Sequence, residues 1–220
     1  MNKLNQLILS FDFEQNFKNL DFYVSKSNEH AFNLIKDWSK YNGKFLNIVG
    51  DKFSGKSHLI NIFLEKNKGL KISKNDLNDD LLKKTKLYEN IILEDLDLTI
   101  NEKFLYSLIN VIESENKQLI ITSNVPVVNL NFELSDLKSR LKNFYLSKIE
   151  NPDDDLMFAL ILKNLSDRQI SIDKKLIDYI IKRIDRSYSK IFDFIYKIDQ
   201  ISLKKKKSID FKIIKEALGN

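Results

Sequence analysis

The chain has 220 residues, 43% hydrophobic and 30% charged, a composition typical of a globular protein with a buried core. It contains no cysteine, which excludes disulfides and thiolate metal sites, and its two histidines, His30 and His58, are too far apart in sequence to indicate a metal site. The formal charge of +5 is mostly lysine, which permits nucleic-acid contact but is weak evidence for it. No signal peptide or membrane-spanning run is evident, so we expect a cytoplasmic protein without a membrane partner.

Apolar side chains dominate the first dozen residues, which is unusual for an exposed tail. Such a segment can be an arm folded back on its own domain. The alternative is an extended peptide that binds a partner, with Gln6 making hydrogen bonds and Leu7, Leu9 and Phe11 entering pockets. The residues alone leave both readings open. A helix is predicted next, from about Ser27 to Trp38.

Residues 50–57 fit the phosphate-binding pattern G-x-x-x-x-G-K-[ST] at every fixed position. An apolar run at 45–49 predicts a strand before this segment, and helical spacing at 57–65 predicts a helix after it. The order strand, loop, helix disfavours a chance glycine turn. The glycines let the backbone wrap a phosphate, the lysine adds charge, and the last serine offers an oxygen to Mg²⁺. The candidate nucleotide-binding residues here are Gly50, Asp51, Lys52, Phe53, Ser54, Gly55, Lys56 and Ser57.

Acidic residues follow another apolar run. A strand is predicted at 69–73, a short helix at 76–86, and then a strand at 90–97 that contains Glu94 and Asp95. An acidic turn without function is the simpler interpretation of these two residues in isolation. Beside a phosphate loop, we expect Glu94 to help hold Mg²⁺ and Asp95 to polarise an attacking water.

Two further segments complete the predicted α/β part. After a helix at 102–116, a buried strand at 118–124 ends in polar residues, which places Thr122 to Asn124 beside the γ-phosphate if the sheet is parallel. A short helix at 135–141 carries Arg140, one of only four arginines in the chain. A lone arginine is usually structural, so its scarcity marks it only as a candidate.

From Pro152 onward only helices are predicted. They cover residues 152–165, 173–184, 187–203 and 210–218, the last with Asp210 as a candidate N-cap, and we expect Lys204 to Lys207 to form a solvated loop. The predicted fold class is therefore α/β, with a parallel sheet flanked by helices followed by a small all-α domain. The predicted divisions are 1–14, 15–148 and 149–220.

Taken in this order, these motifs resemble the DnaA/Hda family of AAA+ ATPases over nearly the whole chain. The resemblance implies a P-loop NTPase core with a helical lid. It assigns residues 21–28, including Val24 and Asn28, to the adenine pocket, and 92–95 to the Walker B strand. It further assigns 122–124, including Asn124, to sensor 1, 137–140 to the arginine-finger helix, and 186–192, including Lys190, to the sensor 2 helix.

Two features favour the regulatory branch of that family. Residues 6–11 resemble the peptide by which such regulators bind the DNA sliding clamp, and only Gly219 and Asn220 follow the last predicted helix, where initiators carry a DNA-binding domain. The resemblance implies a protein that binds ADP or ATP with Mg²⁺, docks on the DNA polymerase III sliding clamp and stimulates ATP hydrolysis by the initiator DnaA. Arg140 would act in trans, and DNA would be contacted only through these partners. A homodimer is left open by the sequence.

Three positions depart from the family pattern. Glu94 replaces the usual Asp, Lys190 replaces the sensor 2 Arg, and Asp136 stands where initiators have another arginine. A lysine keeps the charge but loses the bidentate fork, so we expect tight nucleotide binding with weak intrinsic ATPase at most. Two other classes share the loop: a helicase loader or similar DNA-engaged AAA+ ATPase, and a small-molecule phosphoryl transferase.

Overall fold

A five-stranded parallel sheet forms the centre of the α/β part. The computed structural model describes residues 22–41, 43–74 and 78–219. The strands are β1 (Phe45–Val49), β2 (Gly69–Ser73), β3 (Asn90–Leu96), β4 (Gln118–Ser123) and β5 (Tyr145–Lys148), in the order β2-β3-β4-β1-β5 with every neighbouring pair parallel. All carboxyl ends therefore lie along one edge of the sheet, and the ends of β1, β4 and β3 are adjacent there.

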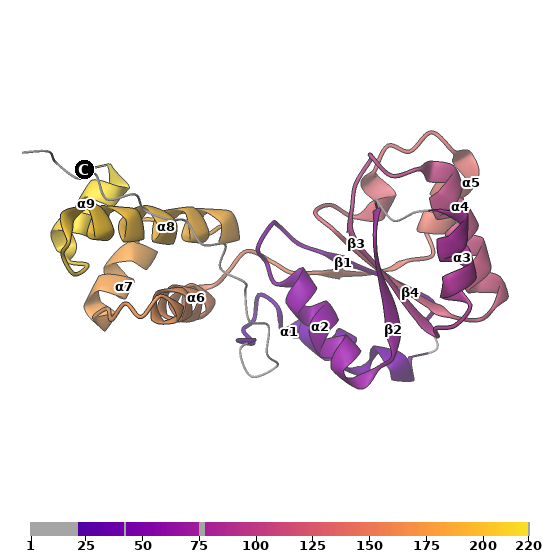
Figure 1. Ribbon diagram of the computed structural model, residues 1–220, viewed down its shortest axis with the longest axis horizontal. Coiled ribbons are helices and arrows are strands. Elements are labelled where there is room, and N and C mark those ends of the chain that lie inside the picture. Colours follow the sequence, from indigo (N-terminus) through magenta and orange to yellow (C-terminus); the bar gives the residue numbers. More distant parts are fainter. Residues whose placement is uncertain (1–21, 42, 75–77, 220) are drawn as a thin grey trace, which may run out of the picture.

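Helices cover both faces of this sheet (Figure 1). On one face lie α1 (Glu29–Asp37) and α2 (Lys56–Lys66), whose apolar side chains pack with Leu46, Ile48, Ile92 and Ile120. On the other lie α3 (Asp79–Thr85), α4 (Glu102–Ser114) and α5 (Ser135–Leu141), packed against the alternate strand residues. Because both faces are covered, the central strands read as continuous apolar runs rather than alternating ones.

Four helices make up the C-terminal helical region: α6 (Asp154–Asp167), α7 (Lys174–Ile181), α8 (Tyr188–Lys205) and α9 (Phe211–Leu218). They enclose their own core, which includes Met157, Ile177 and Ile195. The region lies beside the α/β part (Figure 1), and Leu156 and Tyr188 join the core of the α1–α2 face. Asp210 caps α9 as predicted, accepting a hydrogen bond from the Ile213 N–H at 2.9 Å.

Two predictions of local structure were incomplete or wrong. The edge strand β5 was not predicted, because Tyr145 and Leu146 are about half exposed and give no buried apolar run. Lys204 and Lys205 continue α8 instead of starting a loop, and the helix ends only where Lys206 takes a left-handed conformation at φ 52°. Short 3₁₀ turns, η2 and η4, occupy Trp38–Lys40 and Val127–Asn129. In the described ranges, each helix is too short or too polar to cross a bilayer.

Candidate functional site

The segment 50–57 forms a tight loop between β1 and α2. Gly55 precedes α2 with φ at +95°, a conformation that favours glycine, and the Gly50 N–H donates to the Ser123 carbonyl at 3.2 Å. A Cβ on Gly50 would lie 2.5 Å from the Ser54 hydroxyl oxygen, so the loop closes tightly only without a side chain there. The first N–H groups of a helix have no partner within it, and α2 directs this positive end toward the loop.

Lys56 joins the loop to the end of β4. Its ammonium donates to the carbonyls of Gly50 at 2.7 Å and Asp51 at 3.0 Å, and to the Asn124 side-chain oxygen at 3.0 Å. The residue is buried, and burial lowers the pKa of its amine even though Asp95, Asp51 and Glu94 act in the opposite direction. The structure thus brings the predicted loop lysine and the predicted sensor 1 residue into direct contact.

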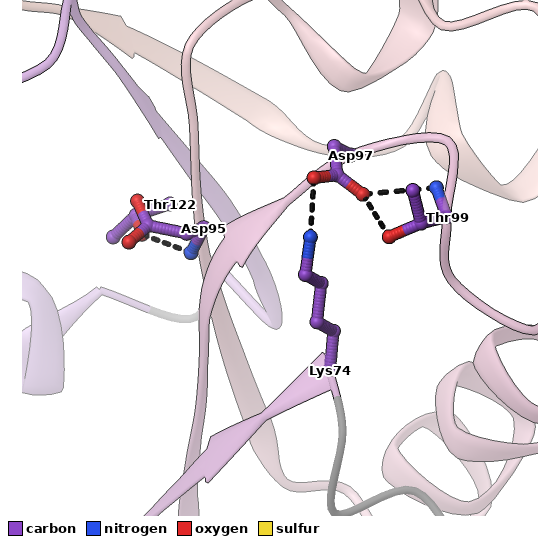
Figure 2. A network of polar contacts seen from close by, with 5 residues as sticks. All are labelled: Lys74, Asp95, Asp97, Thr99 and Thr122. Atoms are coloured by element: carbon purple, nitrogen blue, oxygen red, sulfur yellow. Dashed lines mark hydrogen bonds and ion pairs between the residues drawn. The ribbon is translucent and has the colours of Figure 1, made fainter.

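Glu94 and Asp95 lie at an irregularity in the pairing of β3 with β4. Leu93 is paired with Ile121 but Leu96 with Ser123, so one extra residue is accommodated between them. Asp95 has φ at +50°, and its N–H donates to the Thr122 hydroxyl at 2.9 Å (Figure 2). Bulges of this kind redirect side chains and are common beside active sites. Here the bulge leaves the Asp95 side chain exposed at the carboxyl edge of the sheet.

The two oxygens of Glu94 have different surroundings. Oε2 accepts from the ammonium of Lys71 on β2 at 2.6 Å. Oε1 is buried and, among the residues that the structure describes, has no hydrogen-bond partner. A buried carboxylate oxygen without a partner beside a phosphate loop fits a role in holding hydrated Mg²⁺, an ion commonly bound through one or two carboxylates plus substrate phosphates. Ser57 lies in the first turn of α2 and would supply the second protein oxygen.

A buried asparagine in β1 positions the polar end of β4. Asn47 donates to the Ser123 hydroxyl at 2.9 Å and to the Ile121 carbonyl at 3.2 Å, and accepts from the Val127 N–H at 3.0 Å. These bonds hold the turn that follows Asn124. Asn47 was not among the predicted site residues, although an amide inside an otherwise apolar strand was a usable signal because buried polar groups require partners.

The segment 22–28 reaches the loop at Phe22. The Phe22 ring would lie 3.1 Å from a Cβ on Gly55, which places this segment against the phosphate loop. Asn28 is buried, and its amide accepts from the Ser25 N–H and donates to the Tyr23 carbonyl, both at 2.9 Å. Asn28 therefore shapes the backbone around Val24, whose own side chain is partly exposed. Phe22, at the start of the segment predicted to form the adenine pocket, is the residue that meets the predicted phosphate loop.

The start of α8 approaches the loop from the helical region. The rings of Phe53 and Phe192 lie 4.8 Å apart between centroids, and Tyr188 is buried with its hydroxyl donating to the Glu150 carbonyl at 3.0 Å. Burial raises the pKa of the Tyr188 phenol, which therefore stays protonated as a donor. Lys190 lies between these two aromatic residues in sequence and is exposed. The predicted sensor 2 helix is thus next to the loop.

Arg140 lies at the amino ends of the strands, on the side of the sheet opposite to the phosphate loop. It is in the last turn of α5, shortly before β5 begins at Tyr145, and Tyr145 pairs with Leu46 near the amino end of β1. The phosphate loop follows the other end of the same strand. Arg140 forms an ion pair with Glu113 on α4, has its guanidinium 6.0 Å from the Tyr106 ring centroid, and keeps a third of its side chain exposed. It cannot serve the loop of its own chain.

Other parts of the molecule bear on the predictions as well. Gln6, Leu7, Leu9 and Phe11 lie outside the described residues. A cavity of about 590 Å³ lies between α1 and the start of β5, away from the phosphate loop. His30 borders this cavity, is exposed, and has its Nδ1 3.4 Å from the Ser147 hydroxyl. In the described part of the chain, no three His, Asp or Glu side chains converge into a metal site.

The sheet order, the loop between β1 and α2, and the helical region that follows together define a P-loop protein with the AAA+ fold. Residues 153–218 match the family model described as "Hda, lid domain". The chain is a DnaA/Hda-like AAA+ protein.

Comparison with individual proteins gives the same relationship. The chain is 26% identical to the chromosomal replication initiator protein DnaA of Helicobacter hepaticus over 227 residues, covering 91% of this chain and 49% of that one. It thus spans about half the length of the curated relatives it matches.

Among solved structures, domain III of the Thermotoga maritima replication initiation protein DnaA matches with a TM-score of 0.74 and 18% identity, covering 95% of this chain and 98% of that one. AMPPCP-bound DnaA from Aquifex aeolicus matches with a TM-score of 0.66 and 19% identity, covering 83% and 65%. These structures share the fold.

Proposed function

We propose that this protein is a DnaA-related replication protein that negatively regulates initiation. In this proposal it binds ADP or ATP with Mg²⁺, docks on the DNA sliding clamp through Gln6, Leu7, Leu9 and Phe11, and stimulates ATP hydrolysis by the initiator DnaA. The similarity to DnaA proteins and to the Hda lid model supports the choice of partner.

The position of Arg140 is the observation that carries the proposal. A guanidinium at the edge of the sheet opposite to its own phosphate loop can reach a nucleotide only in a neighbouring molecule. An arginine supplied in trans stabilises the charge that develops on a transferring phosphoryl group, and such residues contribute about 10³- to 10⁵-fold to turnover. In the free protein Glu113 holds this side chain, and the partner's phosphates would replace that carboxylate.

The nucleotide of this chain would have a different role. The backbone of residues 50–57 and Lys56 would bind its phosphates, Ser57 and Glu94 would hold Mg²⁺, and Asn124 would contact the terminal phosphate. The segment around Val24 and Asn28 would receive the base, and Lys190 would approach the phosphates from α8. Bound Mg²⁺ would neutralise phosphate charge. Asp95 would orient water, but a lysine at sensor 2 supports binding with little turnover.

Initiator-bound ATP hydrolysis in the presence of clamp-loaded DNA tests the proposal. Wild-type protein should accelerate hydrolysis. Arg140→Ala should reduce that acceleration at least about 10³-fold while still binding the clamp. The combined variant Gln6→Ala, Leu7→Ala, Leu9→Ala should lose clamp binding, measured by surface plasmon resonance, and retain its own affinity for ADP. Wild-type protein that neither binds the clamp nor accelerates hydrolysis would refute this function and favour a DNA-engaged AAA+ ATPase.

A further inference from the structure

One serine connects the base-binding segment to the helical region across 126 residues of sequence. The Ser27 hydroxyl donates to Asp153 Oδ2 at 3.0 Å and accepts from the Asp153 N–H at 2.9 Å. The Ser27 carbonyl also accepts from the Glu150 N–H at 2.9 Å. Ser27 is buried, whereas Asp153 is half-buried and Glu150 is exposed, so the bonds are shielded from water mainly on the Ser27 side.

On one side, these bonds act on the segment that shapes the base pocket. Ser27 is followed directly by Asn28, whose amide ties together the backbone at Tyr23 and Ser25. Phe22, at the start of the segment, packs near Gly55 in the phosphate loop. A shift of Ser27 would therefore move the backbone on which the base would lie.

On the other side, the same bonds reach two helices of the lid region. Asp153 is the N-cap of α6, since its Oδ1 accepts from the Leu156 N–H at 2.8 Å. The Glu150 carbonyl accepts from the hydroxyl of Tyr188, the first residue of α8. Glu150 and Asp153 thus supply polar contacts that fix both α6 and α8 to the α/β part, in addition to the apolar packing of Leu156 and Tyr188.

We infer that Ser27 is a positioning residue that couples the base-binding segment to the orientation of the lid. The inference rests on the proposed nucleotide site. When Ser27 is bonded to Asp153 and Glu150, the base pocket, α6 and the start of α8 keep one relative arrangement, and Phe192 of α8 stays against Phe53 of the phosphate loop. Without these bonds the lid pivots about residues 149–153, and the base and phosphate contacts no longer form together.

The chemistry of the contact requires a hydroxyl at position 27 and a carboxylate at position 153. The Ser27 hydroxyl oxygen both donates and accepts a hydrogen bond. Ala has no such group, and the thiol of Cys is a weaker donor and acceptor. Burial acts to raise the pKa of Asp153, but hydrogen bonds from Leu156, Ser25 and Ser27 outweigh burial and lower that pKa below its ordinary value. Asp153 is therefore an anionic acceptor at neutral pH.

The absence of cysteine allows a direct measurement of lid position. Spin labels on cysteines introduced at Lys36 in α1 and Lys204 in α8, both exposed, would report the distance distribution between the two parts by pulsed electron resonance. We expect a narrow distribution for otherwise wild-type protein without added nucleotide. Ser27→Ala should broaden it and weaken ADP binding about five-fold or more, and Ser27→Thr should restore both.

Two further variants make the result specific. Asp153→Asn can keep the cap of α6 through Oδ1 but replaces the anionic acceptor Oδ2, so it should broaden the distribution as Ser27→Ala does. Asp210→Asn changes the N-cap of α9, which has the same geometry, with 2.9 Å to the Ile213 N–H, but lies in the lid away from Ser27. It should leave the distribution and the ADP affinity unchanged.

An unchanged distance distribution in both Ser27→Ala and Asp153→Asn would overturn the inference whatever happens to nucleotide affinity. If Ser27→Ala does not fold by circular dichroism, the comparison of Ser27→Thr with Asp153→Asn decides in its place. If wild-type protein binds no ADP, the proposed nucleotide site fails, but the distances still show whether Ser27 sets the position of the lid.

Discussion

Lys56 and Arg140 are the two cations on which the proposed chemistry depends, and the protein holds them in opposite ways. Lys56 is buried at the carboxyl edge of the sheet and donates to two loop carbonyls and to Asn124, which directly follows β4. Arg140 lies at the amino edge, is a third exposed, and is held by one carboxylate and one aromatic ring.

The difference follows from where each cation would act. A group that binds the ligand of its own chain gains from being fixed in advance, because little ordering is left to be done on binding. A group that enters the site of another molecule must first leave its resting contact. An exposed ion pair, which contributes only about 0–1 kcal/mol, is suited to that exchange.

Removing the buried cation should have the largest effect. Lys56→Met should weaken ADP binding by roughly 10²-fold, because hydrogen bonds to charged groups contribute about 1.5–3 kcal/mol each. The fold should tolerate it. Burial holds the pKa of Lys56 below its ordinary 10.5, so the unfolded chain binds more protons between these values, and the charged lysine opposes folding at neutral pH.

Calorimetry and thermal unfolding together test this prediction. The melting temperature without nucleotide should change by less than about 4 °C, which corresponds to roughly 1 kcal/mol for a chain of this size. Lys66→Met is the matched control, since Lys66 is an exposed lysine in the last turn of the same helix α2, outside the phosphate loop. A large fall in the melting temperature of Lys56→Met would mean that the lysine is structural and that its three contacts exist mainly to hold the loop.

The fold and the loop motif were largely predictable from sequence, because their signals are local. β1, β3 and β4 are apolar runs, β2 alternates Leu70 and Ile72 with polar residues, and the boundaries of α5 were predicted correctly. β5 could not be found in this way because its side chains alternate little and half of its surface is exposed. The loop predicted at Lys204 and Lys205 was wrong because a run of lysines is typical of loops. Lysine is nevertheless compatible with a helix wherever its side chain faces solvent.

The candidate site was predictable only as a list of residues. The sequence indicated Glu94 and Asp95, but it contained no sign of the bulge that turns Asp95 to φ 50°. It identified Arg140 without the ion pair to Glu113, and Ser27 lay in a predicted motif without its contact to Asp153. Each of these features depends on tertiary contacts between distant segments, which no periodicity in the sequence reports.

Releasing Arg140 from its ion pair should have a smaller effect than Lys56→Met, and it should increase an activity instead of decreasing one. Glu113→Gln should free Arg140 and increase the stimulation of initiator ATP hydrolysis by about two- to five-fold, the equivalent of an exposed pair of at most about 1 kcal/mol. This stimulation is measured as the rate at which ATP bound to the initiator is hydrolysed. Glu115→Gln is the control, because Glu115 ends the same helix but pairs with Lys117 at 3.0 Å. A reduced stimulation by Glu113→Gln would show that Glu113 orients Arg140 for its task.

The smallest expected effect is the loss of stability on removing the Asp97 carboxylate. Asp97 forms an exposed ion pair with Lys74 at the carboxyl edge of the sheet, the edge where Lys56 also lies. Hydrogen bonds from Lys74 and Thr99 lower the pKa of Asp97 to about 2 (Figure 2). Because the folded pKa is depressed, the pair stabilises the protein above the ordinary value of 3.8, and this contribution disappears as the pH falls through about 2. About half of the side chain is exposed, so the contribution should stay below about 1 kcal/mol.

Urea unfolding of Asp97→Asn at several pH values tests this limit. The variant should be slightly less stable than wild type at pH 7, and the difference should shrink toward zero near pH 2 and also in high salt, which screens exposed pairs. Asp80→Asn is the reference, because Asp80 pairs with Lys83 on α3 with both side chains mostly exposed, and its loss should be smaller still. If Asp97→Asn lowered the free energy of unfolding by several kcal/mol, an exposed ion pair in this protein could hold a side chain firmly. Arg140 would then need more than a competing phosphate to leave Glu113.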